Sequence, residues 1–392
     1  MDYTPILNYI SNYWQLITYQ NLEEKGTLIG LPYPYLVPNT SDGNMFQEMY
    51  YWDSFFISLG VLGTEHEQRI VDMTENMAYL FNRFGLIPNG SRYYFLSRSQ
   101  PPLFTLMIEL AYQVKKRRGD ADADAFLQRL MDAAEREQDT VWMGTRQPHH
   151  RLAYKGLSRY FDINYLDILA SCECGWDHST RCDHRWLEHV PVDLNSILYV
   201  REMAFARTAE QFGQTAKAQQ WRERAEQRAQ TMQELMWSEA DGFFFDFDFK
   251  NEQRNPDPSL AGFYPLWAGI ATPEQAERIV KTWLPHFEFP GGLVTTLKQE
   301  AGMQWAYPNG WAPLQWFVLE GLDRYGFKAD AERLRELWCN NCTDVFVRTG
   351  AMWEKYNVVQ VGESEEGGLY GSVKGFGWSN GVFVDFVRKL DR

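Results

Sequence analysis

Apolar residues recur at spacings of three and four along most of the chain, which is the pattern of amphipathic helices. The clearest run covers residues 66–84, stops at Gly85 and places on one face Ile70, Met73, Met77, Leu80 and Phe81. Residues 103–118 follow the same pattern and end in basic side chains before Gly119, as the helix dipole favours. The same spacing predicts helices over residues 122–138, 193–211, 215–236, 273–283, 311–324 and 328–340.

Within residues 243–249, phenylalanine partly alternates with aspartate, which predicts a short strand at the edge of a hairpin between helices. The helices arrive in pairs without an exact sequence repeat, and about a dozen of them predict an all-α protein. We expect a single domain, residues 1–392, whose inner and outer helices close into a toroid. A helical-repeat solenoid is the alternative. Long aromatic loops such as 86–102 and 350–380 favour the toroid, because they suit a pocket over one mouth.

The composition narrows the class of protein. With 45% hydrophobic residues among 392, the chain has enough apolar side chains for a large core, which excludes disorder as its main state. No apolar stretch approaches the roughly 18 residues of a membrane helix, so we expect no membrane partner. The net charge of −14, without a run of Lys or Arg, argues against nucleic acid as a partner. Nothing in the sequence indicates an oligomeric state.

The chain has an odd number of cysteines, namely Cys172, Cys174, Cys182, Cys339 and Cys342. The first residues, MDYTPILNYISNYW, show no basic region followed by an apolar block. Together these features predict reduced, buried thiols in a cytoplasmic protein. A zinc site that combines the cysteines with His184 is the alternative, but the spacing fits no standard zinc module, so no metal is expected.

Aromatic residues make up 16% of the chain, including 15 Trp. Most are expected in the core. A surplus of Trp also suits sugar binding, because the C–H faces of a pyranose pack on aromatic planes. Six segments combine aromatic with polar side chains and are candidates for such a site: residues 46–56, 87–90 with 96–102, 173–181 with 191–195, 304–313, 353–357 and 375–381.

Carboxylates in these segments can supply the pair that glycoside hydrolysis requires. Asp177 follows Gly175 and Trp176, and desolvation against the indole would raise its pKa toward that of a general acid. Glu354 follows a tryptophan in a separate loop. The residues alone leave this pairing as one candidate among several, which also include Asp53, Glu48 and Glu173.

Three polar residues of the second segment, Asn89, Arg98 and Gln100, lie on loop backbone shaped by Pro and Gly. Such a backbone suits hydrogen bonds to a ligand. Turn chemistry with a surface arginine is the alternative interpretation.

The six segments, in this order, resemble the trehalases of glycoside hydrolase family 37. Residues 46–54 match the signature Phe-x-Glu-x-Tyr-x-Trp-Asp-Ser, and residues 88–90 with 97–102 match a second signature. Residues 304–313 match Gln-Trp-x-x-Pro-x-Gly-Trp-x-Pro, with Ala306 where the family usually has Asp. Residues 354–356 and 375–378 match the C-terminal part, so the likeness extends over residues 46–381.

The resemblance implies an (α/α)6 barrel and an inverting α-glycosidase that hydrolyses trehalose or a closely related small α-glucoside. By motif position Asp177 would be the general acid and Glu354 the general base, and no cofactor is needed because two carboxylates supply the proton transfers. The implied substrate-binding residues are Phe46, Trp52, Asp53, Asn89, Arg98, Gln100, Trp176, Trp305 and Phe376.

The chain departs from the family pattern around the second glucose. The family's Arg before the signature Phe is Met45 here, and its Arg-Pro-Glu-Ser element has no equivalent near residues 161–165. Leu369 stands where the family has an acidic residue, although acidic side chains lie nearby at Glu363, Glu365 and Glu366. These differences leave the catalytic pair intact, but they leave the chemical identity of the aglycone undetermined.

Three other functions remain as alternatives. Family 63 resembles this fold and includes hydrolases of glucosylglycerate and mannosylglycerate. A catalytically silent sugar-binding protein is a second alternative, although it would not need both carboxylates. A helical scaffold for protein partners is a third, and it does not explain why polar residues cluster in aromatic loops.

Overall fold

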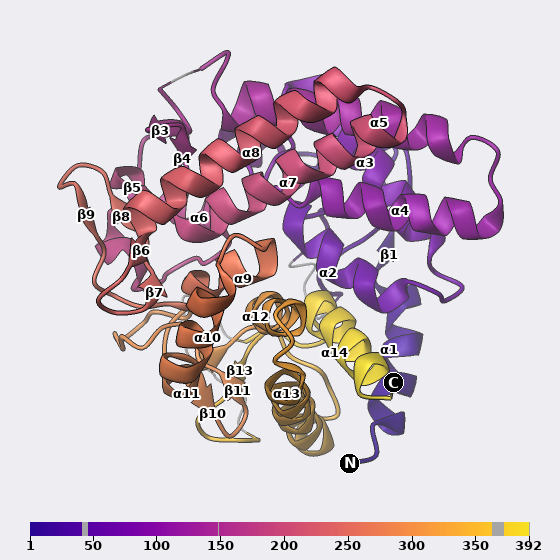
Figure 1. The fold of residues 1–392 in the computed structure, drawn as a ribbon. Coiled ribbons are helices and arrows are strands. Elements are labelled where there is room, and N and C mark those ends of the chain that lie inside the picture. Colours follow the sequence, from indigo (N-terminus) through magenta and orange to yellow (C-terminus); the bar gives the residue numbers. More distant parts are fainter. Residues whose placement is uncertain (41–45, 148, 363–371, 392) are drawn as a thin grey trace.

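The computed structural model describes residues 1–40, 46–147, 149–362 and 372–391, which form an (α/α)6 barrel (Figure 1). Its α-helices are α1 (Thr4–Leu16), α2 (Tyr51–Val61), α3 (Gln68–Phe84), α4 (Phe104–Arg118), α5 (Ala123–Glu137), α6 (Asp167–Cys174), α7 (Val192–Gln211), α8 (Thr215–Met236), α9 (Tyr264–Ala268), α10 (Pro273–Thr282), α11 (Leu284–Phe287), α12 (Ala312–Arg324), α13 (Lys328–Thr349) and α14 (Gly377–Leu390).

Short antiparallel strands lie in the connections between helices. They are β1 (Thr18–Tyr19), β2 (Tyr35–Leu36), β3 (Leu152–Tyr154), β4 (Leu157–Ser158), β5 (His189–Val190), β6 (Trp237–Ser238), β7 (Phe243–Phe244), β8 (Phe247–Asp248), β9 (Gln253–Arg254), β10 (Glu288–Phe289), β11 (Gly292–Leu293), β12 (Asn309–Gly310) and β13 (Tyr356–Asn357). The pair β12–β13 joins two of the segments singled out in the sequence, with Gly310 opposite Tyr356.

Inner and outer helices alternate along the chain. The inner helix α9 packs on α7 and α12, α12 packs on α14, and α14 packs on α2 (Figure 1). The contact between α2 and α14 closes the ring, so the structure is a toroid and not an open solenoid.

Glycines allow the closing helices to approach each other. A Cβ at Gly381 would lie 2.0 Å from the carbonyl oxygen of Phe56, and one at Gly60 would lie 2.8 Å from the Cα of Gly381. Arg388 of α14 also donates to the carbonyl oxygen of Leu59, at 3.0 Å. Larger residues at either glycine would push the two helices apart.

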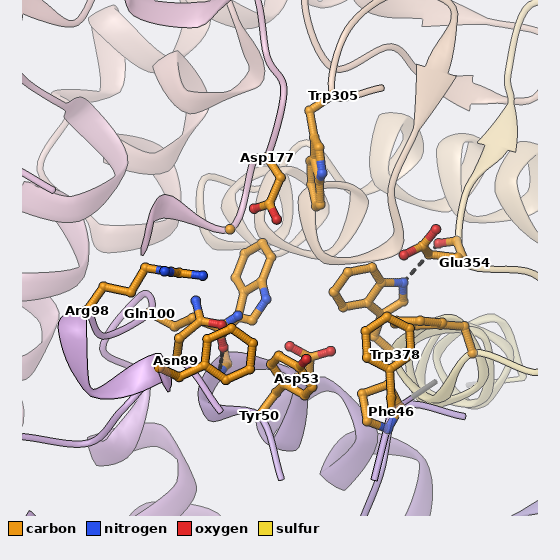
Figure 2. Close-up of a pocket in the computed structure, with 15 residues that line it drawn as sticks. Phe46, Tyr50, Asp53, Asn89, Arg98, Gln100, Asp177, Trp305, Glu354 and Trp378 are labelled. Atoms are coloured by element: carbon orange, nitrogen blue, oxygen red, sulfur yellow. Dashed lines mark hydrogen bonds between the residues drawn. The ribbon is translucent and has the colours of Figure 1, made fainter. Parts of the chain in front are cut away.

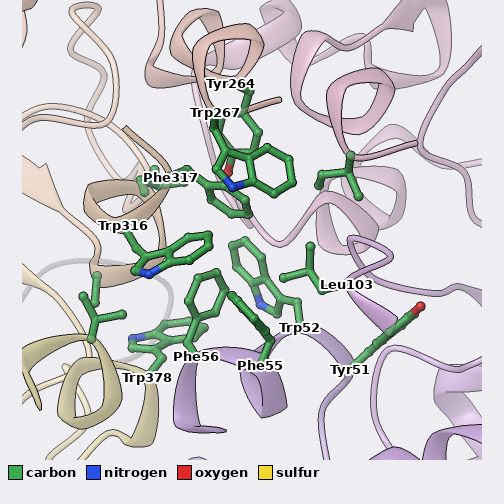
Figure 3. Packing of buried hydrophobic residues seen from close by; sticks show 14 of the residues in the cluster. Tyr51, Trp52, Phe55, Phe56, Leu103, Tyr264, Trp267, Trp316, Phe317 and Trp378 are labelled. Carbon is green, nitrogen blue, oxygen red and sulfur yellow. The ribbon is translucent and has the colours of Figure 1, made fainter. Parts of the chain in front are cut away.

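Aromatic side chains of the inner helices α2, α9 and α12 pack against one another in the hydrophobic core (Figure 3). Phe55 of α2 packs edge to face on Trp316 of α12, with centroids 5.1 Å apart, and Tyr264 of α9 stacks on Phe317 at 4.2 Å. Trp52 belongs both to this cluster and to the lining of the cavity described below. The floor of the cavity is therefore part of the hydrophobic core.

Most sequence expectations for the fold are confirmed. All eight predicted helices are present, and the one expected over 328–340 continues to Thr349. The strand expected over 243–249 is wrong as a single element, because β7 pairs with β6 whereas β8 pairs with β5 and β9. The loop expected over 350–380 is shorter, since α14 begins at Gly377. Among the described helices, none has the length and apolarity to cross a membrane.

Candidate active site

A cavity of about 140 Å³ opens at one mouth of the barrel (Figure 2). Every predicted site residue except Trp176 lines it. The lining residues are Pro38, Phe46, Tyr50, Trp52, Asp53, Asn89, Phe95, Arg98, Gln100, Gly175, Asp177, Trp305, Glu354, Phe376 and Trp378.

The turn after α6 places Asp177 in the cavity. Gly175 ends this helix with a φ of 78°, and a Cβ at this position would lie 2.6 Å from the indole of Trp52. Only glycine combines this backbone conformation with this close approach. Burial raises the pKa of Asp177 to about 7; the positive charge of Arg98 opposes the rise, and the negative charge of Glu354 adds to it.

Glu354 lies on the other side of the cavity from Asp177 (Figure 2). Its backbone is held on two sides: its N–H donates to the carbonyl oxygen of Val373 at 2.9 Å, and its carbonyl oxygen accepts from Trp378 Nε1 at 2.9 Å. Its side chain is only 1% exposed. The two carboxylates therefore face one cavity from opposite walls, on separately fixed loops.

Asp53, in the first turn of α2, is a third carboxylate in the cavity. Burial, together with the negative charges of Glu354 and Asp177, raises the pKa of Asp53 well above its usual range. Among the lining residues of the described chain, Arg98 is the only cation. The cavity thus favours neutral, hydroxyl-rich ligands over anions.

The polar residues from the second segment lie on the side of Asp177 (Figure 2). Arg98 Nη1 is 3.3 Å from the buried carboxylate of Asp162. Asn89 Nδ2 donates to two carbonyl oxygens, those of Ser99 at 3.2 Å and Cys172 at 3.0 Å. Gln100 Oε1 accepts a hydrogen bond from the N–H of Trp52 at 3.0 Å and so satisfies a backbone donor in the first turn of α2. These side chains line the cavity and also hold its loops together.

Aromatic side chains form the walls. Phe46 packs edge to face on Phe376, with ring centroids 5.8 Å apart, and the ring centroids of Trp52 and Trp305 are 6.0 Å apart. The expectation that Trp176 contacts substrate is not supported by its position: it is fully buried, beside Trp305 and under the guanidinium of Arg181. Its indole belongs to the hydrophobic core and does not line the cavity.

Sequence reasoning missed three aromatic lining residues, Tyr50, Phe95 and Trp378. Tyr50 and Trp378 fall inside the quoted segments, so the signal was their place within a motif. Phe95 precedes the Ser-Arg-Ser motif and carries the guanidinium of Arg98 over its ring, at 5.1 Å from the centroid. No pattern in the sequence distinguished it from an ordinary core phenylalanine.

The competing carboxylates serve the scaffold. Glu48 accepts from Tyr50 Oη at 2.8 Å and pairs with Arg92 at 3.0 Å. Glu173 accepts the N–H groups of Ser99 and Phe161, both at 2.6 Å, and pairs with Arg151.

Neither Glu48 nor Glu173 lines the cavity. Glu173 instead ties the Arg98 loop to Phe161, in the segment where the family's Arg-Pro-Glu-Ser element has no equivalent. The departures noted at Met45, Glu363, Glu365, Glu366 and Leu369 lie outside the described residues.

The five cysteines are free thiols, and four of them are buried. Within the described part of the chain, no three His, Cys, Asp or Glu side chains are grouped so that they could hold a metal ion. The proposed zinc alternative therefore has no support in the described residues.

Comparisons with known proteins agree with this geometry. The Trehalase family model matches residues 6–168 and 167–391. The periplasmic trehalase of Pseudomonas aeruginosa is 34% identical over 98% of this chain and 76% of its own length. The periplasmic trehalase of Shigella flexneri is 33% identical over 97% of this chain and 73% of its own.

Among solved structures, the neutral trehalase of Saccharomyces cerevisiae superimposes with a TM-score of 0.80 at 29% identity, covering 91% of this chain and 73% of that one. A family 63 mannosylglycerate hydrolase from Thermus thermophilus superimposes with a TM-score of 0.71 at 19% identity, over 98% of this chain and 100% of that one. The second likeness shows the shared fold alone.

The expectation of a cytoplasmic protein is wrong, since the relatives above are named periplasmic trehalases. The odd cysteine count was a poor guide to the compartment. Cys174, Cys182, Cys339 and Cys342 are buried, and burial raises the pKa of each thiol. A buried, protonated thiol is inert to disulfide exchange in either compartment.

The family model accounts for nearly the whole chain, and the segments that first indicated the likeness meet around one cavity. A relative that is 34% identical over 98% of the chain supports the same assignment. The chain belongs to the trehalase family.

Proposed function

We propose that the protein hydrolyses α,α-trehalose by a single displacement with inversion at the anomeric carbon. The observation that supports this most directly is the placement of Asp177 and Glu354 on opposite walls of one small cavity (Figure 2). Inverting glycosidases need two opposed carboxyl groups, with room between them for the sugar and the attacking water. Trehalose enters the proposal through the relatives, which are named trehalases.

Asp177 is the proposed general acid. A pKa of about 7 leaves about half of this carboxyl protonated at pH 7, so it can donate its proton to the glycosidic oxygen as the bond to the anomeric carbon breaks. The leaving glucose therefore lies on the Asp177 side. This is also the side of Arg98 and Asn89 (Figure 2).

Glu354 is the proposed general base. As a carboxylate it removes a proton from the water that attacks the anomeric carbon from the opposite face. One bond to the anomeric carbon forms while the other breaks, and the proton lost by water compensates for the one donated by Asp177. An α-glucoside then gives β-glucose from the retained ring.

The remaining lining residues bind the retained glucose in this proposal. Its apolar faces pack on Phe46, Trp52, Trp305 and Phe376, and its hydroxyls bind Asp53. We also propose that residues 1–392 act as one catalytic domain, because Asp53 and Trp378 reach the same cavity from opposite ends of the chain.

The test is to incubate the purified protein with trehalose, kojibiose, sucrose, glucosylglycerate and mannosylglycerate and to measure free hexose. Proton NMR in the first minutes of turnover then shows which anomer appears first. Because only the retained ring is inverted, α,α-trehalose should first give α- and β-glucose in equal amounts, and this ratio supports the proposal. Early α-glucose alone would show a covalent intermediate, hydrolysis of only the glycerate glycosides would favour the family 63 activity, and no hydrolysis would favour a sugar-binding protein.

A further inference from the structure

Lys355, which does not line the cavity, lies directly against the proposed base. Its Nζ is 3.3 Å from Glu354 Oε2, and the side chains of both residues are buried, with exposures of 0% and 1%. Nζ also lies 5.4 Å from the ring centroid of Trp311, the residue that backs Trp305. The ammonium group thus sits behind the wall of the cavity, in contact with the carboxylate and away from the substrate.

Among the described residues that line the cavity, carboxylates outnumber the cations that could balance their charge, so a cation in contact with Glu354 matters. Asp53 and Asp177 face the same cavity, and each feels the negative charge of Glu354. Arg98 is beside Asp177 and is paired with Asp162, so its positive charge acts mainly on these two carboxylates. Lys374 lies over the ring of the preceding residue, Trp353, with its ammonium 5.5 Å from the centroid.

Three carboxyl groups in one buried cavity cannot all be ionised without a counter-charge. Inversion requires them to differ, because one must hold a proton while another must accept one. A buried cation within 4 Å favours the ionised form of its partner and lowers the cost of burying that charge. Of these three carboxyl groups, Glu354 is the one that Lys355 contacts, at 3.3 Å.

Resting on the function proposed above, we propose that Lys355 is a positioning residue that makes Glu354, and not Asp53 or Asp177, the base. It keeps the Glu354 carboxylate ionised and holds Oε2 through a charge-assisted contact. Lys355 touches neither the sugar nor the water, and it acts only through the carboxylate beside it.

The test uses the pH dependence of kcat/KM in Lys355→Met, Lys355→Arg and the wild type. The acidic limb of the profile reports protonation of the base. Loss of the cation should move this limb to higher pH by about one to three units, so that kcat/KM below the limb falls at least about ten-fold. Lys355→Arg keeps the charge and should restore most of the limb, while Lys374→Met, which removes an exposed cation nearby, should leave it in place.

A second measurement separates positioning from a merely structural role. If Lys355 acts through Glu354, then Lys355→Met should add no further loss to the residual rate of Glu354→Gln. An acidic limb that stays in place, or full additivity in the double variant, would overturn the inference. If Lys355→Met does not fold, Lys355→Gln is the neutral variant: its acidic limb should move to higher pH while that of Lys355→Arg stays in place, and two unmoved limbs would overturn the inference. A wild type that hydrolyses no trehalose would refute the proposed function before any variant is compared.

Discussion

The indole of Trp305 lies flat on the indole of Trp311, with ring centroids 3.7 Å apart and an angle of 5° between their planes. Trp311 donates from Nε1 to the carbonyl oxygen of Gln304 at 3.1 Å and does not line the cavity. The wall is therefore built of two layers, of which only Trp305 lines the cavity. Binding and support are assigned to different residues of one motif.

Trp305→Ala should raise KM by roughly ten-fold or more and lower stability by about 3–5 kcal/mol, because it removes a ligand contact and leaves a void against Trp311. Trp311→Phe should lower the melting temperature with a smaller change in KM, since the cavity lining is retained. Steady-state kinetics and thermal unfolding measure both effects. Equal changes in KM for the two variants would contradict the two-layer description.

Asp177→Asn and Glu354→Gln should each reduce kcat by at least about 10²–10⁴-fold while the protein still folds and binds sugar. The matched control is Glu320→Gln on α12, which removes a carboxylate that pairs with Lys389 and Arg335 away from the cavity. Initial rates with trehalose and near-ultraviolet circular dichroism provide the comparison. A role assigned to either residue is wrong if its variant keeps more than about a tenth of the wild-type kcat.

The basic limb of kcat/KM should lie near pH 7, where Asp177 loses its proton. Arg98 opposes the raised pKa of Asp177, so Arg98→Met should move this limb to higher pH. A pH–rate profile from pH 4 to pH 9 measures the shift. A limb that moves to lower pH would show that Arg98 does not act on the acid by its charge.

The same pKa predicts an effect on stability. Because the pKa of Asp177 is about 7 in the folded protein and 3.8 as a free side chain, the folded state holds a proton that the unfolded chain releases between these values. The stabilisation from this proton is complete at low pH and is lost as pH rises toward 7. Asp177→Asn should therefore raise the melting temperature more at pH 8 than at pH 4, and an equal gain at both values would show that burial does not raise this pKa.

The aglycone side should discriminate less than the retained-glucose side. In the described lining Arg98 is the only cation, and the family's Arg-Pro-Glu-Ser element is absent. The site therefore has fewer hydrogen-bond donors that an altered aglycone could leave unpaired, and the penalty for such an aglycone should be smaller. We expect trehalose to be preferred by less than about a thousand-fold in kcat/KM over other α-glucosides that share the retained glucose. A series with constant glucose and varied aglycone measures this, and a steeper preference would mean that other residues replace the lost contacts.

Outer helices such as α3 were predictable because one of their faces is exposed to water. In α3, the buried positions include Ile70, Met73 and Met77, and Gly85 ends the helix in a left-handed conformation, as the periodic pattern indicated. The helices α2, α9 and α14 were missed because they are buried nearly all round. All eleven residues of α2 are buried, so polar residues do not alternate with apolar ones at the helical period.

The site was predictable to the extent that its residues lie in recognisable motifs. Asp177 and Glu354 belong to different motifs, and only the closed ring brings them to one cavity. Sequence reasoning could not tell which member of a motif turns inward: it assigned Trp176 to the ligand and left out Tyr50 and Trp378. Lys355 escaped notice because a lysine beside a glutamate is ordinary on a surface, and its burial becomes apparent only in three dimensions.

The glycine-lined contact between α2 and α14 also bears on how the protein acquires activity. Arg388 and Leu59, which are hydrogen bonded across it, are separated by 329 residues in the chain. Contacts of such separation form late and slowly, because a long stretch of chain must be ordered before they gain anything. The cavity takes Trp52 and Asp53 from one side of this seam and Trp378 from the other. We therefore expect catalytic competence to appear only when the ring closes, so that a refolding assay that follows glucose release would time this closure.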